Sequence, residues 1–254
     1  MTIKATAEQL VARIEIARPE KKNAMTAPMY QAMADAIAHA EADEAVRALL
    51  ICGQADVFTA GNDLQDFLSH PPSGEDAPVF AFMRALHEAK KPVLAAVCGA
   101  AVGIGTTMLM HCDLVYCADN AMFSMPFVSL GLCPEFGSSV LVTLGAGYHR
   151  AAEKLLLGEP ISAPEALEMG MVNRLLPPGE VEAYAMRQAQ RLAALPAAAL
   201  RETKRLLRAP WADGVQVAMR EEIEGFGRLL ASDEAKAIMR SFLEHRAQRC
   251  AKDV

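Results

Sequence analysis

The sequence has no Cys-x-x-Cys pair and no cysteine and histidine spacing typical of a zinc site. Its six cysteines lie mostly inside apolar runs, so we expect buried free thiols in a reducing compartment rather than disulfides. The run His111-Cys112-Asp113 superficially resembles a ligand cluster, but three successive side chains point in different directions and cannot close on one ion. We therefore expect no metal site.

The chain also lacks an excess of positive charge, and we expect no targeting segment. Its net charge of -6 argues against nucleic acid as the main partner, because phosphate binding requires a basic surface. The N-terminus has no apolar core like that of a signal peptide, and three glycines interrupt the uncharged stretch from Val93 to Met110. We expect this stretch to be a buried strand that leads into a buried helix, and the protein to be soluble and cytoplasmic, with no membrane partner.

What the sequence does have is enough apolar material for a large core. Hydrophobic residues make up 52% of its 254 residues and charged residues 22%, which is typical of soluble globular proteins. This length predicts one domain with an appended subdomain. We find no internal sequence repeat and no low-complexity segment.

Strand and helix signals alternate in the first part of the chain. Val11 to Ala17 alternates apolar and polar residues, as a half-buried strand does. Continuous apolar runs at 48–53, 93–99 and 114–118 predict fully buried strands. Thr26 can cap a helix that begins near Pro28 and ends near Ala42.

Beyond about Pro177 the strand signals end, and helical patterns cover 181–195, 197–207, 215–230 and 233–246. Ser232 is a candidate cap for the last of these helices. A helical tail with little core of its own is expected to pack on neighbouring subunits, so we expect an oligomer.

Three glycine-containing segments carry the candidate chemistry: 58–64, 99–105 and 130–139. Taken alone, the first predicts a tight turn with Asp63 capping a helix. The second lacks the third glycine of a dinucleotide fingerprint and could be only a packing turn. The third places Glu135 among apolar residues just before a helix, where a lone glutamate is often only a helix-start charge.

Together the three segments resemble the crotonase (enoyl-CoA hydratase/isomerase) superfamily. Further matches to its motifs are Asn23-Ala24-Met25, Pro92 to Gly99, His111 to Leu114, and Ser162 to Asn173. The resemblance implies an α/β fold of the ClpP/crotonase type, a spiral of ββα units at 1–195 that holds the acyl-CoA site. A helical region at 196–254 would form trimers, which could pair into hexamers.

The resemblance also assigns roles to backbone groups. It implies that the N–H groups of Asn62 and Ile104 form an oxyanion hole for the thioester carbonyl. Removing a proton next to a thioester creates an enolate, and each preorganised donor aimed at its oxygen is worth roughly 3 kcal/mol. Ile104, at the start of a buried helix, would add the positive end of the helix dipole.

Glu135 falls where the Δ3,Δ2-enoyl-CoA isomerases of the superfamily carry their catalytic acid. The two glutamates with which its hydratases activate water correspond here to Thr107 and Phe127, neither of which transfers a proton usefully. The resemblance therefore favours an isomerase in which one carboxylate takes a proton from C2 of a 3-enoyl-CoA and returns it at C4. Apolar neighbours are expected to raise the pKa of Glu135 toward the range needed for this transfer.

For coenzyme A, which is part of the substrate rather than a separate cofactor, the resemblance suggests Lys21 and Lys22 near the phosphates and the backbone of Ala60 and Asp63 near the adenine. The two lysines could equally be solvated surface residues. Phe242 matches an aromatic residue of the last helix that reaches a neighbouring subunit's coenzyme A, but His245 replaces the lysine that accompanies it.

Two other functions stay open at the level of sequence. The same site could support hydration or another enolate reaction, such as ring-opening isomerisation of an epoxide-derived CoA ester. A non-catalytic acyl-CoA-binding protein would keep the glycine segments but would not depend on Glu135. The length of the acyl chain is not fixed by any motif.

Overall fold

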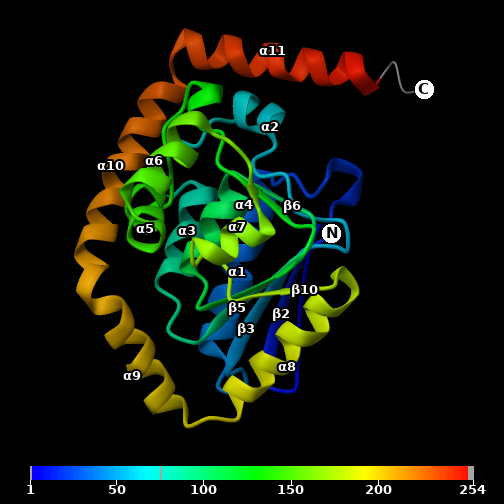
Figure 1. The fold of residues 1–254 in the computed structure, drawn as a ribbon, viewed down its shortest axis with the longest axis vertical. Helices are drawn as coiled ribbons and strands as arrows, with labels where there is room; N and C mark the ends of the chain where they lie inside the picture. The colour runs from blue at the N-terminus through cyan, green and yellow to red at the C-terminus, as the bar shows by residue number, and fades with distance from the viewer. Residues whose placement is uncertain (1, 75, 251–254) are drawn as a thin grey trace.

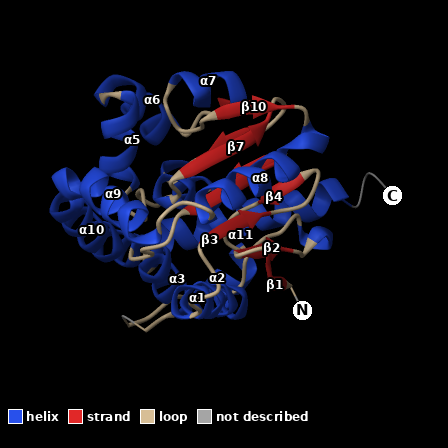
Figure 2. Cartoon of the chain, turned by 90° about the horizontal axis from the view of Figure 1, so that it is seen from below, coloured by secondary structure: helices blue, strands red, loops and turns tan. Residues whose placement is uncertain are grey.

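The computed structural model describes residues 2–74 and 76–250, the last five of them as backbone only, so the side chain of Cys250 lies outside the described part. Ten strands form two sheets, arranged as Figures 1 and 2 show. The six-stranded sheet has the order β1 (Ile3–Glu8), β2 (Val11–Ile16), β3 (Ala48–Cys52), β5 (Val93–Val97), β7 (Leu114–Ala118) and β10 (Arg174–Leu176). The four-stranded sheet has the order β4 (Val57–Thr59), β6 (Ala100–Val102), β8 (Met122–Ser124) and β9 (Ile161–Ser162).

The continuous apolar runs became the centre of the larger sheet. β3, β5 and β7 are parallel neighbours, with Leu49 opposite Val93 and Leu94 opposite Leu114. Nearly every residue of these three strands is buried, which explains why the runs show no alternation. Only β1 runs antiparallel in this sheet, as a hairpin with β2.

Each of the strands β3, β5 and β7 of the larger sheet is followed by a short strand of the smaller one and then by helices. β3 leads to β4 and then to α2 (Leu64–Ser69) and α3 (Pro78–His87), and β5 leads to β6 and α4 (Ile104–Thr107). β7 leads to β8 and then to α5 (Ser138–Ala146) and α6 (Tyr148–Leu157). Because β4, β6 and β8 are parallel neighbours, the turns that follow β4 and β6 lie at the same edge of the smaller sheet. This spiral of ββα units confirms the predicted fold class.

Helices cover the larger sheet and form the tail. α8 (Val181–Ala193) packs along β2, β3, β5 and β7, and α1 (Ala27–Ala42) packs against α3; α7 spans Ala163–Glu168. After β10 the described chain is entirely helical, as predicted, with α9 (Ala197–Arg208) and α10 (Ala212–Leu230) along one side of the molecule in Figure 1. α11 (Asp233–Cys250) crosses one end and contacts α2. Among the described residues, no helix is long and apolar enough to span a membrane.

The two helix caps predicted from the sequence have different outcomes. Ser232 accepts a hydrogen bond from the N–H of Ala235 at 3.2 Å and so caps α11, as predicted. Thr26 occupies the N-cap position of α1, but its hydroxyl makes no capping bond. Asp66 of α2 accepts the N–H of Ala27 instead, at 2.9 Å, so a side chain distant in sequence replaced the local cap.

Asn23 anchors the loop after β2 to the strand that precedes the first glycine segment. It is fully buried and adopts a left-handed backbone conformation with φ of 57°. Its side chain accepts the N–H of Arg18 at 2.7 Å and donates to the carbonyls of Val57 and Phe58 at 3.2 and 3.0 Å. Asparagine suits this position because it tolerates the left-handed region and satisfies three backbone groups at once.

We expect Asn23→Ala to lower the free energy of unfolding by about 3 kcal/mol, because it leaves buried backbone groups unpaired and places a Cβ without polar compensation in the left-handed region. Urea unfolding measures this loss. The exposed Asn120 provides the control, because Asn120→Ala is expected to change stability by less than about 0.5 kcal/mol. Equal effects of the two substitutions would contradict the assigned role of Asn23.

Candidate active site

The first two glycine segments form strand-to-helix turns that pack directly against each other. Gly61, in the turn between β4 and α2, has φ of 81°, and a Cβ there would lie 2.5 Å from the carbonyl oxygen of Val102. Gly105 of α4 is equally constrained, because a Cβ would lie 2.4 Å from the side chain of Thr59. Small residues are therefore required for the two turns to approach each other.

The backbone around Asn62 leaves its N–H directed away from the neighbouring loop. Met25 donates its N–H to the carbonyl of Gly61 and accepts the N–H of Asp63, both at 2.8 Å. In a parallel bridge of this kind, the residue between the two bonded neighbours turns its own N–H and C=O to the opposite side. The side chain of Asn62 is also held, because the hydroxyl of Tyr30 donates to its Oδ1.

Ile104 is the first residue of α4 and is fully buried. The N–H groups of Thr106 and Thr107 bond to the carbonyl of Gly103, so α4 begins at this glycine. The N–H of Ile104 therefore belongs to the first turn of a helix, where backbone donors have no partner within the helix. The structure thus places Asn62 and Ile104 on adjacent turns, and their role as an oxyanion hole stays a prediction.

A small pocket opens between these turns and the loop before α5. Its volume is about 50 Å³. Backbone and side-chain atoms of both turns line it, together with apolar residues: Ala60, Gly61, Asn62, Val102, Gly103, Pro126, Phe127, Leu130, Leu132 and Phe226. This volume is far below the range of roughly 300–1,000 Å³ that holds drug-sized ligands, so an acyl thioester requires the lining to open.

Glu135 lies just before α5 and is only 5% exposed, although it does not itself line the small pocket. Its neighbours Leu132, Phe136 and Phe127 are buried, as the sequence predicted. Burial raises the pKa of Glu135 to about 8, and the negative charge of Glu222 adds to this effect. Its Oε1 has no hydrogen-bond partner among the described residues.

Two hydroxyl oxygens, Thr107 Oγ1 and Ser138 Oγ, are also buried without a hydrogen-bond partner among the described residues. Buried polar side-chain atoms normally have partners, and those that do not often belong to functional sites. All three atoms belong to the second and third glycine segments or to the helices that follow them, so this part of the molecule is the strongest candidate for chemistry.

The backbone at Glu135 is held in place from a distant helix. Phe136 has φ of 60°, which is unusual for an aromatic residue. His111 Nε2 lies 2.7 Å from the carbonyl oxygen of Phe136, and the two rings stack with centroids 3.9 Å apart. Burial lowers the pKa of His111 to about 3, so the ring is neutral near pH 7 and donates through Nε2. Its Nδ1 is then an acceptor for His87 Nδ1 at 3.3 Å.

The predicted coenzyme A residues have mixed surroundings. Lys21 and Lys22 are exposed, and the carbonyl of Lys22 accepts the N–H of Ala60 at 3.0 Å, so this loop lies beside the first glycine segment. Asp63 caps α2 and pairs with Arg18 at 2.7 Å. Burial tends to raise the pKa of Asp63, but the hydrogen bonds from Arg18 and from α2 outweigh it and lower the pKa.

Capping α2 is the purely structural role that the sequence predicted for Asp63 as an alternative. Its backbone N–H already donates to the carbonyl of Met25. Phe242 lies on α11 and is 49% exposed, so about half of its surface is left uncovered by its own chain. His245 is exposed as well. The coenzyme A contacts of all these residues stay predictions.

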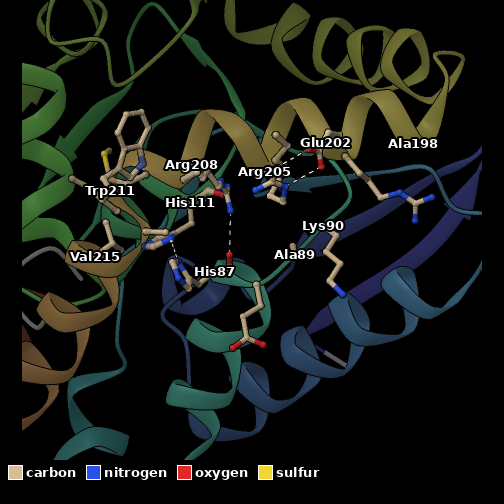
Figure 3. A pocket seen from close by; sticks show the side chains of 17 residues that line it. His87, Ala89, Lys90, His111, Ala198, Glu202, Arg205, Arg208, Trp211 and Val215 are labelled. Carbon is tan, nitrogen blue, oxygen red and sulfur yellow. Dashed lines mark hydrogen bonds and ion pairs between the residues drawn. The ribbon is translucent and has the colours of Figure 1, made fainter.

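A larger pocket lies elsewhere, between α9 and the loop after α3 (Figure 3), with a volume of about 610 Å³. Arginines dominate one wall, but two of them have acidic partners: Arg205 pairs with Glu202 at 2.6 Å and Arg208 with Asp113 at 3.3 Å. Asp113 also pairs with the buried Lys204 at 2.7 Å. None of the three glycine segments contributes to its lining, so we place the chemistry at Glu135 and not here.

Three residues that complete the Glu135 site were not found from the sequence: Tyr30, His111 as a support of Phe136, and Glu222. Tyr30 and Glu222 resemble ordinary helix residues in the sequence, and His111 stands out there only as the start of a motif before the next strand. Among the described residues, no group of three or more histidine, cysteine, aspartate or glutamate side chains could hold a metal ion.

Comparison with known proteins finds the same fold and related sequences. Residues 6–251 match the enoyl-CoA hydratase/isomerase family. The chain is 33% identical to enoyl-CoA delta isomerase 2 of Rattus norvegicus over 95% of its own length, and it spans 63% of that protein. It is 29% identical to the short-chain-enoyl-CoA hydratase of Clostridium acetobutylicum, covering 94% of this chain and 93% of that one.

Among solved structures, OdaA of Pseudomonas aeruginosa is 45% identical with a TM-score of 0.93, over 95% of this chain and 98% of that one. The structural match extends through both sheets and the helical tail, since it covers almost the full length of each chain.

Proposed function

Because the chain belongs to the enoyl-CoA hydratase/isomerase family, we propose that it is a Δ3,Δ2-enoyl-CoA isomerase that moves a double bond of an acyl-CoA thioester. The observation that carries this proposal is the buried carboxylate of Glu135, with a pKa raised to about 8 and an oxygen that has no partner among the described residues. A group of this kind can both take and return a proton near neutral pH.

The reaction follows from the two halves of the site. Ionised Glu135 removes a proton from C2 of a 3-enoyl-CoA, and the electron pair moves into a dienolate. The backbone N–H groups of Asn62 and Ile104 bind the resulting oxyanion, each contributing roughly 3 kcal/mol. Protonated Glu135 then returns the proton at C4, which leaves the conjugated 2-enoyl thioester and restores the carboxylate.

Hydration is disfavoured by the same surroundings. The two positions at which the resemblance places the hydratase glutamates hold Thr107 and Phe127, both buried. The phenyl ring of Phe127 also lines the small pocket, where a carboxylate would have to orient water. With only one carboxylate available, proton transfer within the substrate is favoured over addition of water.

Room for the acyl chain lies next to this site. A pocket of about 220 Å³ is lined by Met25, which precedes α1, and by residues of α1, α2 and α3, among them the apolar Phe67 and Val79. Tyr30 lines it as well and is bonded to Asn62, so the pocket adjoins the proposed oxyanion hole. We place the acyl chain here and the coenzyme A on the outer side, near Lys21, Lys22, Ala60 and Asp63.

The helical tail supports a trimer, alone or paired into a hexamer, with residues 1–195 as the catalytic core and 196–254 as the assembly region. Large apolar side chains of this tail are exposed in the single chain, including Leu206, Leu207 and Val217. Phe242 would then reach the coenzyme A of a neighbouring subunit.

Light scattering is expected to give a mass three or six times the 27.3 kDa of one chain. The double substitution Leu206→Glu and Leu207→Glu is expected to lower this mass without changing the helix content, because it places charge on exposed apolar surface of α9. A wild-type monomer at micromolar concentration would contradict the proposed assembly.

Glu135→Gln is expected to slow conversion of 3-enoyl-CoA to the conjugated 2-enoyl isomer by roughly 10²–10⁴-fold, measured by ultraviolet absorbance. The wild-type kcat/KM is expected to rise with pH and to level off above about pH 8, because the base must be ionised and burial raises its pKa.

The exposed Glu180 provides the matched control, and Glu180→Gln is expected to retain wild-type turnover. A Glu135→Gln enzyme with undiminished turnover would exclude Glu135 as the base. A wild type that binds CoA esters but converts neither short nor long 3-enoyl substrates would refute the isomerase function itself.

A further inference from the structure

A second buried carboxylate holds the segment that carries Glu135. Glu222 lies in the middle of α10 and is 8% exposed, whereas its neighbours Glu221 and Glu224 on the same helix are exposed. A buried carboxylate is costly unless hydrogen bonds satisfy it, so its partners identify its role.

The hydrogen-bond partners of the Glu222 side chain lie at the start of α5. Its Oε2 accepts the N–H of Gly137 at 2.5 Å, and its Oε1 accepts the N–H of Ser139 at 3.0 Å and the hydroxyl of Ser139 at 2.5 Å. Gly137 occupies the N-cap position of α5 and offers no side chain of its own. Glu222 therefore takes the place of the local cap, in the same way that Asp66 does for α1.

We propose that Glu222 is a positioning residue for the isomerisation: it fixes the loop from Glu135 to Ser139 in the orientation needed for proton transfer and places a second negative charge beside Glu135. This inference rests on the proposed function only in naming Glu135 as the base. It assigns to the C-terminal helical region a part in the chemistry, because α10 reaches the active-site loop through this one side chain.

The two carboxylates are not equivalent. Three hydrogen bonds stabilise the anion of Glu222, whereas Glu135 Oε1 has no partner among the described residues. Burial raises the pKa of Glu222, but the bonds from Ser139 and Gly137 oppose this effect. When the pH falls, the proton is therefore expected to go to Glu135 first, with Glu222 still ionised.

The other titratable groups near the two carboxylates do not supply a positive charge. The negative charges of Glu135 and Asp66 act on the hydroxyl of Tyr30 on α1. The negative charges of Glu222 and Glu135 act on the thiol of Cys133 in the loop. Burial raises the pKa of both groups, and the nearby carboxylates raise it further, so both are neutral at pH 7. The cation in this region is Arg228, which acts on Cys133. The negative charge of Glu222 therefore acts on Glu135, and among the described side chains no cation pairs with either carboxylate.

The test is a titration of glutamate side chains labelled with ¹³C at the carboxyl carbon, followed by NMR on the full-length protein without substrate. The Glu135 signal is assigned as the one lost in Glu135→Gln, and the Glu222 signal as the one lost in Glu222→Gln. In Glu222→Gln the pKa of Glu135 is expected to fall by about one unit or more, because a neighbouring like charge is removed. In Glu221→Gln, on the exposed face of the same helix, it is expected to stay at the wild-type value.

Turnover measurements distinguish the effect of the Glu222 charge from the effect of its hydrogen bonds to the loop. Ser139→Ala removes one hydrogen bond but keeps the charge of Glu222, so it is expected to lower kcat several-fold and to leave the pH dependence of kcat/KM in place. Glu222→Gln is expected to lower kcat about 10-fold or more and to move the pH dependence to lower pH, since the base then ionises more readily. A role in folding alone would not move the pH dependence.

An unchanged pKa of Glu135 in a folded Glu222→Gln protein would overturn the inference. If that variant does not fold, Glu222→Asp, which keeps the charge, assigns the Glu222 signal and the wild-type titration decides: Glu222 must stay ionised while Glu135 titrates, and the reverse order would overturn the inference as well. If the protein is not an isomerase, the wild type will show no turnover. The titration can still be interpreted in that case, because it is carried out without substrate.

Discussion

A carboxylate buried with no cation beside it among the described side chains is the constraint on which the rest of this structure depends. Glu135 is 5% exposed, and the charge that acts on it is the negative charge of Glu222. Both burial and the like charge disfavour its ionised form, which raises its pKa to about 8. Two side chains hold the backbone around Glu135 in place. His111 donates to the carbonyl of Phe136, and Glu222 accepts the N–H groups at the start of α5.

The donors on the opposite side of the proposed reaction are fixed by backbone packing instead. Gly61 and Gly105 allow two strand-to-helix turns to meet, and the parallel neighbours β4 and β6 place both turns at one sheet edge. Backbone donors need no particular side chain, so Asn62 and Ile104 need not be chemically special residues. The proposed site therefore combines one buried acid with two backbone dipoles, and the helical tail contacts the loop of Glu135 through Glu222 of α10.

Much of this arrangement could be predicted from the sequence, and the remainder could not for identifiable reasons. The runs that became β3, β5 and β7 are long enough to give a clear apolar signal, but β4, β6 and β8 have three residues each and show no periodicity. Glu135 was found because it sits in a recognisable glycine-containing motif. Glu222 was not, because on the helix it looks like Glu221 and Glu224, and only the fold shows which of the three is buried.

The central claim is that one shielded carboxylate carries the same proton from C2 to C4. Conversion of a 3-enoyl-CoA with both C2 positions deuterated, carried out in ordinary water and followed by mass spectrometry of the early product, tests this most directly. The account predicts that a substantial fraction of product molecules carries the transferred deuterium at C4, because buried Glu135 exchanges slowly with solvent compared with the return step. A C4 hydrogen that comes entirely from water in the first turnover would contradict it.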